Sequence, residues 1–306
     1  MQIRRLKHHE IDFQKWDLCV QSSPDGLTYA LSWYLDIVCP NWEALVAGDY
    51  AAVFPLTRRK KFGFSYLYQP AFTQQCGVFC SGKKADENVV HEFLSAIPKE
   101  YRLIEIQLNT GNSVKSESGF EIIRKRTYHL SFNSTIEKIR SSYSENLRRN
   151  LKKAAKANHV LSFEENVQEL IELFQNNRGK EGVGLKTDDY HALERLISEG
   201  RKRKSVEIPS IRNAAGELIA GAVFLQSAHS LIFLFSGANS EAKESGAMSF
   251  LIDAMIERQT PSDKVLDFEG SMDDDLARYY RSFGSQEIVY LQIRKNNLPP
   301  LIRRFK

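Results

Sequence analysis

The chain has 306 residues, of which 42% are hydrophobic and 26% charged, and its formal net charge is +4. This composition is typical of a globular protein, and the length favours two domains because a single hydrophobic core rarely serves more than ~250–300 residues. No apolar run approaches the ~18 residues of a membrane-spanning helix, and no apolar segment follows the basic N-terminus, so we expect neither a membrane span nor a secretory signal. A net charge of +4 is too small to require a nucleic-acid partner, and we expect no DNA partner.

All four cysteines lie in the first 80 residues: Cys19, Cys39, Cys76 and Cys80. They are too few and too unevenly spaced for a disulfide framework, and no histidine pair completes a metal site beside them. We therefore expect buried apolar thiols, no metal, and a reducing, cytoplasmic location.

In the first half, apolar periodicity and turn residues predict helices alternating with short strands. The expected elements are a helix at 27–38, strands at 43–47 and 50–57 around the turn Gly48-Asp49, strand and loop at 66–80, a helix at 86–97 capped by Asp86, and strands at 101–108 and 121–132.

In the second half, apolar periodicity and helix start and stop residues predict helices first, then three consecutive strands, and then alternating helices and strands. The first three helices are expected at 145–158, with Ser144 as N-cap, at 167–176, and at 188–200, with Gly200 at its end. Strands follow at 205–212, 217–226 and 230–236, and then a polar loop at 237–245. The last elements are a helix at 246–259, a strand at 265–268, a helix at 275–282 and a strand at 287–293.

This order is similar to the GNAT acyltransferase fold, in which the loop after the fourth strand binds phosphate at a helix N-terminus. The residues in that place are Ser245, Gly246 and Ala247, which we predict to bind the acyl donor. The coenzyme A signature of GNAT proteins is matched only in part, because Met248 stands where a small residue belongs. A solvated loop with Ser245 as a helix N-cap explains the segment equally well.

Three further segments carry a resemblance that extends over both halves. They are Ala30-Leu31-Ser32-Trp33-Tyr34, the basic run from Asn146 to Lys156, and the segment from Asp267 to Gly284, which ends in Tyr279-Tyr280-Arg281-Ser282-Phe283-Gly284. Together they resemble the Fem family of non-ribosomal peptidyltransferases and the related GNAT-like acetyltransferases. The resemblance implies an acyltransferase of two tandem GNAT-like domains, with the transfer site in the second domain and help in acceptor binding from the first.

The last segment departs from the family pattern at one position. The family lysine in Phe-Lys-x-x-Phe-Gly falls on Tyr280, and the nearest cation is Arg281. If that lysine stabilises negative charge in the transition state, Arg281 takes over its role or the activity is lost. Tyr280 then donates a proton or only packs, and in the second case the chain is a non-catalytic binding protein on a degenerate GNAT fold.

Two groups of charged residues complete the predicted site. Asp267 and Glu269 alternate on a predicted strand, where neighbouring carboxylates can act as a general base for an amine; a solvated Glu269 is the alternative. Arg148, Arg149, Lys152 and Lys153 form a cationic stripe on a predicted helix, able to hold a phosphate-bearing substrate or a tRNA, or simply facing solvent.

We therefore predict an α/β chain of two GNAT-like domains, at 1–134 and 135–306, each with a mixed, mostly antiparallel sheet flanked by helices. The predicted reaction moves an acyl or aminoacyl group onto an amine. The donor is aminoacyl-tRNA or acetyl-coenzyme A, with no tightly bound cofactor. A peptidoglycan or other cell-envelope precursor, a polysaccharide amine and a small metabolite all stay open as acceptors.

Overall fold

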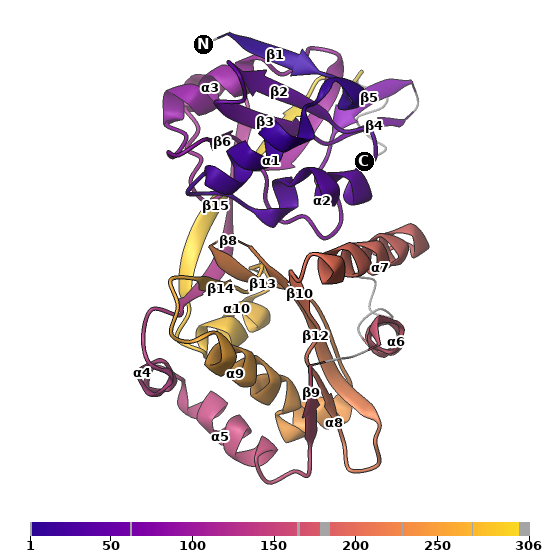
Figure 1. Cartoon of the computed structure of the whole chain (residues 1–306), viewed down its shortest axis with the longest axis vertical. Coiled ribbons are helices and arrows are strands. Elements are labelled where there is room, and N and C mark those ends of the chain that lie inside the picture. Colours follow the sequence, from indigo (N-terminus) through magenta and orange to yellow (C-terminus); the bar gives the residue numbers. More distant parts are fainter. Residues whose placement is uncertain are drawn as a thin grey trace. The chain divides into compact units, whose positions relative to one another are not determined.

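The computed structural model describes residues 2–61, 63–163, 166–177, 184–227, 229–270 and 272–299. The chain forms two compact units (Figure 1): unit 1 is Met1–Arg126 with Val289–Lys306, and unit 2 is Thr127–Ile288. Strands β8 (Glu121–Ser131) and β15 (Gln286–Asn296) each contribute residues to both units. This division differs from the predicted boundary at 134/135, because the end of β8 pairs with a strand of unit 2 whereas β15 returns to pair with a strand of unit 1.

Unit 1 contains two sets of paired strands. One set has the order β1-β2-β3-β6 and is antiparallel throughout; in the other, β5 pairs antiparallel with β4 and parallel with β7, and β7 pairs antiparallel with β15. The strands are β1 (Ile3–Leu6), β2 (Glu43–Ala47), β3 (Ala52–Leu56), β4 (Arg58–Lys61), β5 (Phe64–Leu67), β6 (Phe79–Cys80) and β7 (Tyr101–Gln107). The helices are α1 (Phe13–Ser22), α2 (Ser32–Val38) and α3 (Glu87–Ser95), with short 3-10 turns at His8–Glu10, Thr28–Ala30 and Ser116–Ser118.

Local sequence signals account for several elements of unit 1. The hairpin turn at Gly48 joins β2 to β3 as predicted, and Asp86 caps α3 by accepting a 2.9 Å hydrogen bond from the Val89 N–H. All four cysteines are free and buried, as expected. Burial raises the pKa of the Cys19 and Cys76 thiols to about 12, so both stay protonated at neutral pH.

Unit 2 is built on one mixed sheet with the order β8-β14-β13-β12-β11-β9; among its described strands, β13 and β14 pair in parallel and the other neighbours pair antiparallel. The strands are β9 (Val160–Ser162), β10 (Val206–Glu207), β11 (Ser210–Arg212), β12 (Leu218–Gln226), β13 (Ser230–Ala238) and β14 (Val265–Asp267). The helices are α4 (Ile136–Ser141), α5 (Glu145–Ala154), α6 (Val167–Asn176), α7 (Thr187–Lys202), α8 (Ser240–Ser245), α9 (Ala247–Gln259) and α10 (Asp274–Arg281). A mixed, mostly antiparallel sheet flanked by helices is thus found in each unit, as predicted.

Helices cover both faces of this sheet, with α9 and α6 on opposite sides of β12 (Figure 1). The core on the α9 side includes Leu251, Met255 and Phe268, each at most 1% exposed. On the other side α6 buries Leu170, Ile171 and Phe174, and burying such side chains contributes ~1.5–3 kcal/mol each.

Two predictions for unit 2 were wrong in detail. Gly200 does not end its helix, since α7 continues to Lys202. The glycine is instead explained by packing: a side chain at this position would lie 2.3 Å from Val206. The segment 237–245 is not a loop, since β13 extends to Ala238 and α8 follows at Ser240, with Asn239 as its N-cap.

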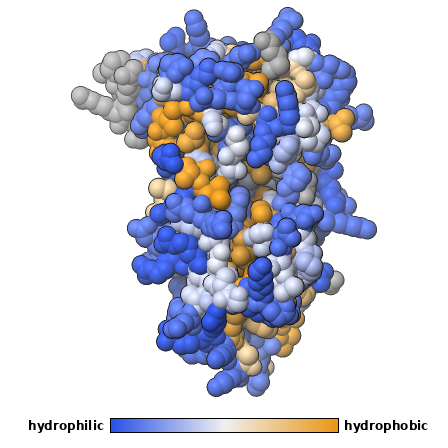
Figure 2. Space-filling model, turned by 90° about the vertical axis from the view of Figure 1, so that its left-hand side faces the viewer, coloured by the Kyte–Doolittle hydropathy of each residue, from blue (hydrophilic) through white to orange (hydrophobic). Residues whose placement is uncertain are grey.

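The hydropathy of the surface fits a composition that is typical of a globular protein. The face shown in Figure 2 is mostly hydrophilic, and its hydrophobic residues gather in a few areas. Among the described residues, no helix is long and apolar enough to cross a membrane.

Candidate active site

A pocket opens in unit 2 where the parallel strands β13 and β14 stop pairing. Their pairing covers only Ser230 to Ile232 on β13; β14 then ends at Asp267, whereas β13 continues to Ala238. Beyond this point lies a pocket of about 580 Å³, here called the α9 pocket. Residues of α5, α6, β13, α8, α9 and α10 line it, including Asn150, Phe174, Ser236, Gly246, Tyr279 and Tyr280.

Glycines bring α6 to one side of this pocket. Gly221 on β12 and Gly237 on β13 are directly paired across the sheet, so both face α6. A side chain at Gly237 would lie 3.1 Å from the backbone nitrogen of Phe174, and one at Gly221 would lie 3.0 Å from Leu170. The missing side chains therefore let α6 approach and place Phe174 beside the pocket.

The three residues predicted to bind the donor lie at the junction of α8 and α9. Gly246 lines the α9 pocket, Ala247 is fully buried as the first residue of α9, and the Ser245 hydroxyl oxygen is buried. Gly246 has a φ of +78°, and a side chain there would lie 2.6 Å from the Asn150 carbonyl oxygen. The glycine is thus required by the turn and by the contact with α5, in addition to its place in the pocket.

The helix α8 changes what this segment offers to a ligand. Within it, the N–H of Lys243 donates to the Asn239 carbonyl, that of Gly246 donates to the Ala242 carbonyl, and that of Ala242 donates to the Asn239 side chain. These N–H groups have partners inside the protein. A phosphate in the pocket would therefore depend on the first N–H groups of α9, which lack partners within their own helix.

Two tyrosines of α10 line the pocket together with Ser249 of α9. The Tyr279 and Ser249 hydroxyl oxygens are 3.3 Å apart, and burial raises the pKa of Tyr279 to about 12, so its hydroxyl stays protonated at neutral pH. The Tyr280 ring is 8% exposed and stacks on Phe268 at 4.9 Å between centroids. The pocket therefore combines apolar walls with hydroxyl groups that can donate hydrogen bonds, among them those of Tyr279 and Ser249.

Arg281 and the basic stripe of α5 lie outside the lining of the α9 pocket. Arg281 borders a neighbouring pocket of about 470 Å³ between α5 and α10, and its guanidinium carbon is 5.9 Å from the Tyr128 ring centroid. Both pockets include Asn150 and Tyr279 in their linings. The side chains of Arg148, Arg149, Lys152 and Lys153 are exposed on α5.

Residues 141–270 match the family model of the acetyltransferase (GNAT) domain. The crystal structure of FemX is similar over 99% of both chains, with a TM-score of 0.69 and 12% identity. A tandem GNAT protein from the clavulanic acid biosynthesis pathway is similar over 97% of this chain and 99% of that one, with a TM-score of 0.55 and 8% identity. The chain has a tandem GNAT fold.

A third solved structure shares the fold. It is the C-terminal domain of a proposed lysylphosphatidylglycerol synthetase from Agrobacterium fabrum, similar over 93% of this chain and 92% of that one, with a TM-score of 0.56 and 10% identity. No curated protein matches the chain by sequence.

Asp267 occupies the end of β14 in the second GNAT unit and is 3% exposed. Its carboxylate accepts hydrogen bonds from the Thr127 hydroxyl at 2.5 Å and from the Glu269 N–H at 2.9 Å, and the Thr127 oxygen accepts the Gly270 N–H at 3.0 Å. The expectation that Asp267 and Glu269 alternate along one strand was wrong. β14 ends at Asp267, and Glu269 follows in left-handed backbone with a φ of +52°.

His129 is a neighbour of Asp267 that the sequence did not reveal. The two residues are paired across β8 and β14, and the His129 Nε2 lies 3.4 Å from an Asp267 oxygen. His129 also lines a pocket of about 530 Å³ with Ser131, Lys138 and Gly284. Residues 127 and 129 share a face with Asp267 only because of this pairing, so no local motif could have predicted the group.

Proposed function

We propose that the chain transfers an acyl or aminoacyl group from a donor in the α9 pocket to an amine. The observation that carries this proposal is the pocket itself. It lies where β13 and β14 stop pairing, beside the N-terminus of α9, with protonated hydroxyls of Tyr279 and Ser249 on its wall. The GNAT family match over residues 141–270 supports the reaction class.

In the proposed step, the amine nitrogen attacks the carbonyl carbon of the donor and forms a C–N bond. The bond from that carbon to the leaving oxygen, or to sulfur in a thioester, breaks as the tetrahedral intermediate collapses. The proton lost by the amine is taken by a base and passes to the leaving group, so no external reactant is needed. Hydrogen bonds from the Tyr279 and Ser249 hydroxyls stabilise the oxyanion that forms in between.

The proton's route and the anchoring of the donor fall to the other predicted residues. Asp267 and Glu269 handle the proton, and the His129 Nε2 lies 3.4 Å from an oxygen of Asp267. Tyr280 in the α9 pocket and Arg281 in the neighbouring pocket stabilise charge, and Ser245, Gly246 and Ala247 hold the donor at the start of α9. The exposed cations Arg148, Arg149, Lys152 and Lys153 contact phosphate along α5, whose Asn150 lines the pocket.

The donor we favour is an aminoacyl-tRNA rather than acetyl-coenzyme A. The N–H groups of Ala242, Lys243 and Gly246 are already bonded within the protein and so do not form a cradle for a pyrophosphate. Glu241 and Glu244 add negative charge on the same helix. The likeness to FemX and to a proposed lysylphosphatidylglycerol synthetase fits aminoacyl transfer, and with it an acceptor of the cell envelope.

Donor binding is measured as the change in melting temperature on addition of charged tRNA, uncharged tRNA or acetyl-coenzyme A. We expect charged tRNA to stabilise the protein more than uncharged tRNA, and acetyl-coenzyme A to have little effect, because only a ligand that binds the folded state raises the melting temperature. Stabilisation by acetyl-coenzyme A alone would assign the thioester as donor instead.

A blocking variant locates the site. Ser236→Trp places a large side chain in the α9 pocket from β13, so we expect it to lose the extra stabilisation by charged tRNA while keeping any effect of uncharged tRNA. Tyr66→Trp, a half-buried position on β5 of unit 1, is the matched control. If no donor stabilises the wild-type chain, the protein is better described as a non-catalytic binding protein.

A further inference from the structure

Unit 1 contains a basic pocket that the proposed acyl transfer does not use. Its volume is about 600 Å³, and it lies among β1, β2, β4 and the turn that follows β1. Five Lys and Arg side chains and two carboxylates line it, which leaves a formal excess of three positive charges: the residues are Arg5, Lys7, Arg58, Arg59, Lys60, Glu43 and Glu100.

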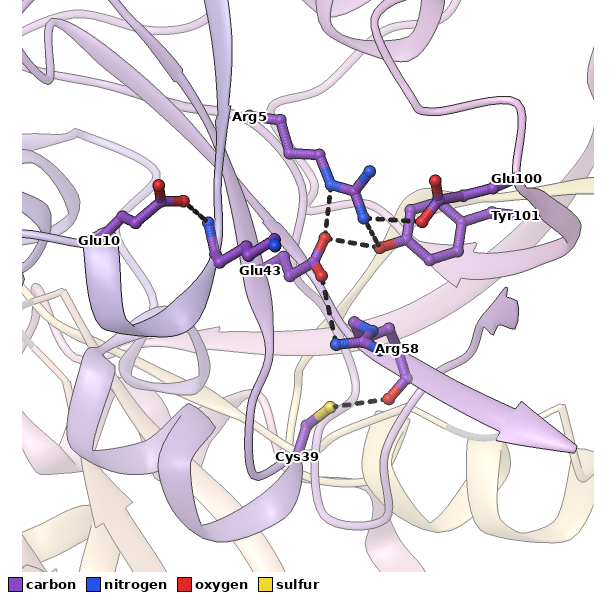
Figure 3. A network of polar contacts seen from close by, with 8 residues as sticks. Arg5, Glu10, Cys39, Glu43, Arg58, Glu100 and Tyr101 are labelled. Carbon is purple, nitrogen blue, oxygen red and sulfur yellow. Dashed lines mark hydrogen bonds and ion pairs between the residues drawn. The ribbon is translucent and has the colours of Figure 1, made fainter. Parts of the chain in front are cut away.

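A buried carboxylate fixes two of these arginines. Glu43 is 4% exposed, and its oxygens lie 2.6 Å from Arg5 Nε and 3.2 Å from Arg58 Nη1. The Tyr101 hydroxyl donates to the same carboxylate at 2.8 Å, and Arg5 also bonds Glu100 at 2.8 Å. Figure 3 shows Arg5 and Arg58 approaching Glu43 from two sides. Glu43 therefore holds two guanidinium groups in place, and together with Glu100 it balances their two charges.

The remaining cations of the pocket are not neutralised by the part of the chain that the structure describes. Lys7, Arg59 and Lys60 form no ion pair with a carboxylate of the described residues, and Arg59 instead lies over the Tyr68 ring at 4.1 Å. Gathering like charges in a concave site costs electrostatic free energy, which a bound anion would recover. Fixed arginines beside flexible lysines are the combination that recognises phosphate oxygens.

We infer that this basic pocket binds a phosphate-bearing anion, either a soluble phosphate or pyrophosphate compound or the phosphate of a lipid headgroup. The inference is independent of the proposed acyl transfer, because every residue that carries it belongs to unit 1. A soluble compound and a lipid would meet the same cations, so the experiment has one arm for each source.

In the first arm, the full chain is titrated calorimetrically with inorganic pyrophosphate and with inorganic phosphate. In the second arm, it is sedimented with vesicles of phosphatidylglycerol or of phosphatidylcholine. We expect saturable binding in one arm, weakened about tenfold or more in Lys7→Gln/Lys60→Gln, since each lost bond to a charged group is worth about that factor. Neither lysine supports the Glu43 network, and Arg59→Gln serves as a second variant if the double variant melts early.

The matched control, Lys15→Gln/Lys83→Gln, removes the same charge from exposed positions of unit 1 outside the pocket. Binding to pyrophosphate without binding to vesicles identifies a soluble ligand. Binding to phosphatidylglycerol but not phosphatidylcholine vesicles identifies a lipid. The inference is overturned if neither arm shows binding, or if the control loses as much binding as the pocket variants.

Discussion

At the scale of single residues, the hydroxyl of Tyr279 carries the most specific part of the proposed chemistry. It lies in the α9 pocket 3.3 Å from the Ser249 hydroxyl, and its raised pKa keeps it a hydrogen-bond donor at neutral pH. Tyr279→Phe removes only the hydroxyl, so we expect a transfer rate reduced about 10²-fold or more, as for the loss of one oxyanion donor. The rate is measured at saturating donor; a rate equal to that of wild type would remove Tyr279 from the mechanism.

The same variant has a consequence for stability at high pH. The folded-state pKa of Tyr279 is about 12, above its ordinary value of 10.0. The unfolded chain therefore releases this proton first, and the contribution of Tyr279 to stability is lost as the pH rises from 10 towards 12. Denaturant unfolding across this range should show a steeper loss in wild type than in Tyr279→Phe, and parallel curves would contradict the assigned burial.

Asp267 can act as a base, as a structural group, or as both, and two substitutions separate these roles. Asn at position 267 keeps an oxygen for the bonds from Thr127 and Glu269 but cannot take a proton, whereas Ala leaves the buried Thr127 hydroxyl without its acceptor. We expect Asp267→Asn to lose transfer at nearly unchanged stability, and Asp267→Ala to lose ~1–3 kcal/mol as well. An active Asn variant would leave Asp267 with a structural role alone.

At the scale of elements, the α8–α9 junction depends on a glycine. Gly246 combines a φ of +78° with a close approach to the Asn150 carbonyl oxygen, whereas Gly216 has a φ of +83° with open space around it. We expect Gly216→Ala to cost ~1 kcal/mol from backbone strain alone and Gly246→Ala to cost clearly more, because the added methyl group also forces α5 away. Urea unfolding of both variants measures the difference, and equal losses would mean that the junction does not rest on this contact.

The elements themselves follow from the sequence where the signal is local. β2 and α6 span the residues predicted for them, and Ser144 and Asp86 act as N-caps as expected. The prediction fails where tertiary contacts decide. Gly200 lies inside α7, where the close contact with Val206 leaves no room for a side chain, and residues 240–245 form α8 although their composition is that of a polar loop.

The residues of the candidate site could likewise be predicted where a local motif marks them, and not where tertiary contacts bring them together. Gly246 and Tyr280 were predicted from motifs, and both line the α9 pocket. The Thr127–His129–Asp267 group could not be predicted, because it depends on the pairing of two strands more than 130 residues apart in the chain. Arg281, chosen as the nearest cation to Tyr280, borders a different pocket, since adjacent residues of a helix point in directions about 100° apart.

At the scale of the whole molecule, the element order of the second half and the motifs that resemble the Fem family in both halves predicted the tandem GNAT fold, and the solved structures agree over nearly the full chain. The exact division of the chain was not predictable. The last strand belongs largely to unit 1 because Ile293 and its neighbours pair with β7, which lies more than 180 residues earlier in the sequence. Such long-range pairing leaves no local trace in composition or periodicity.

The most direct test of the central claim is a transfer measurement. The full chain is incubated with tRNA charged with an isotopically labelled amino acid and with candidate amine acceptors of the cell envelope, and the acceptors are weighed by mass spectrometry. The account predicts a labelled acceptor heavier by one aminoacyl residue, formed by wild type and not by Ser236→Trp. Labelled product formed equally by both proteins, or transfer from acetyl-coenzyme A and not from charged tRNA, would contradict it.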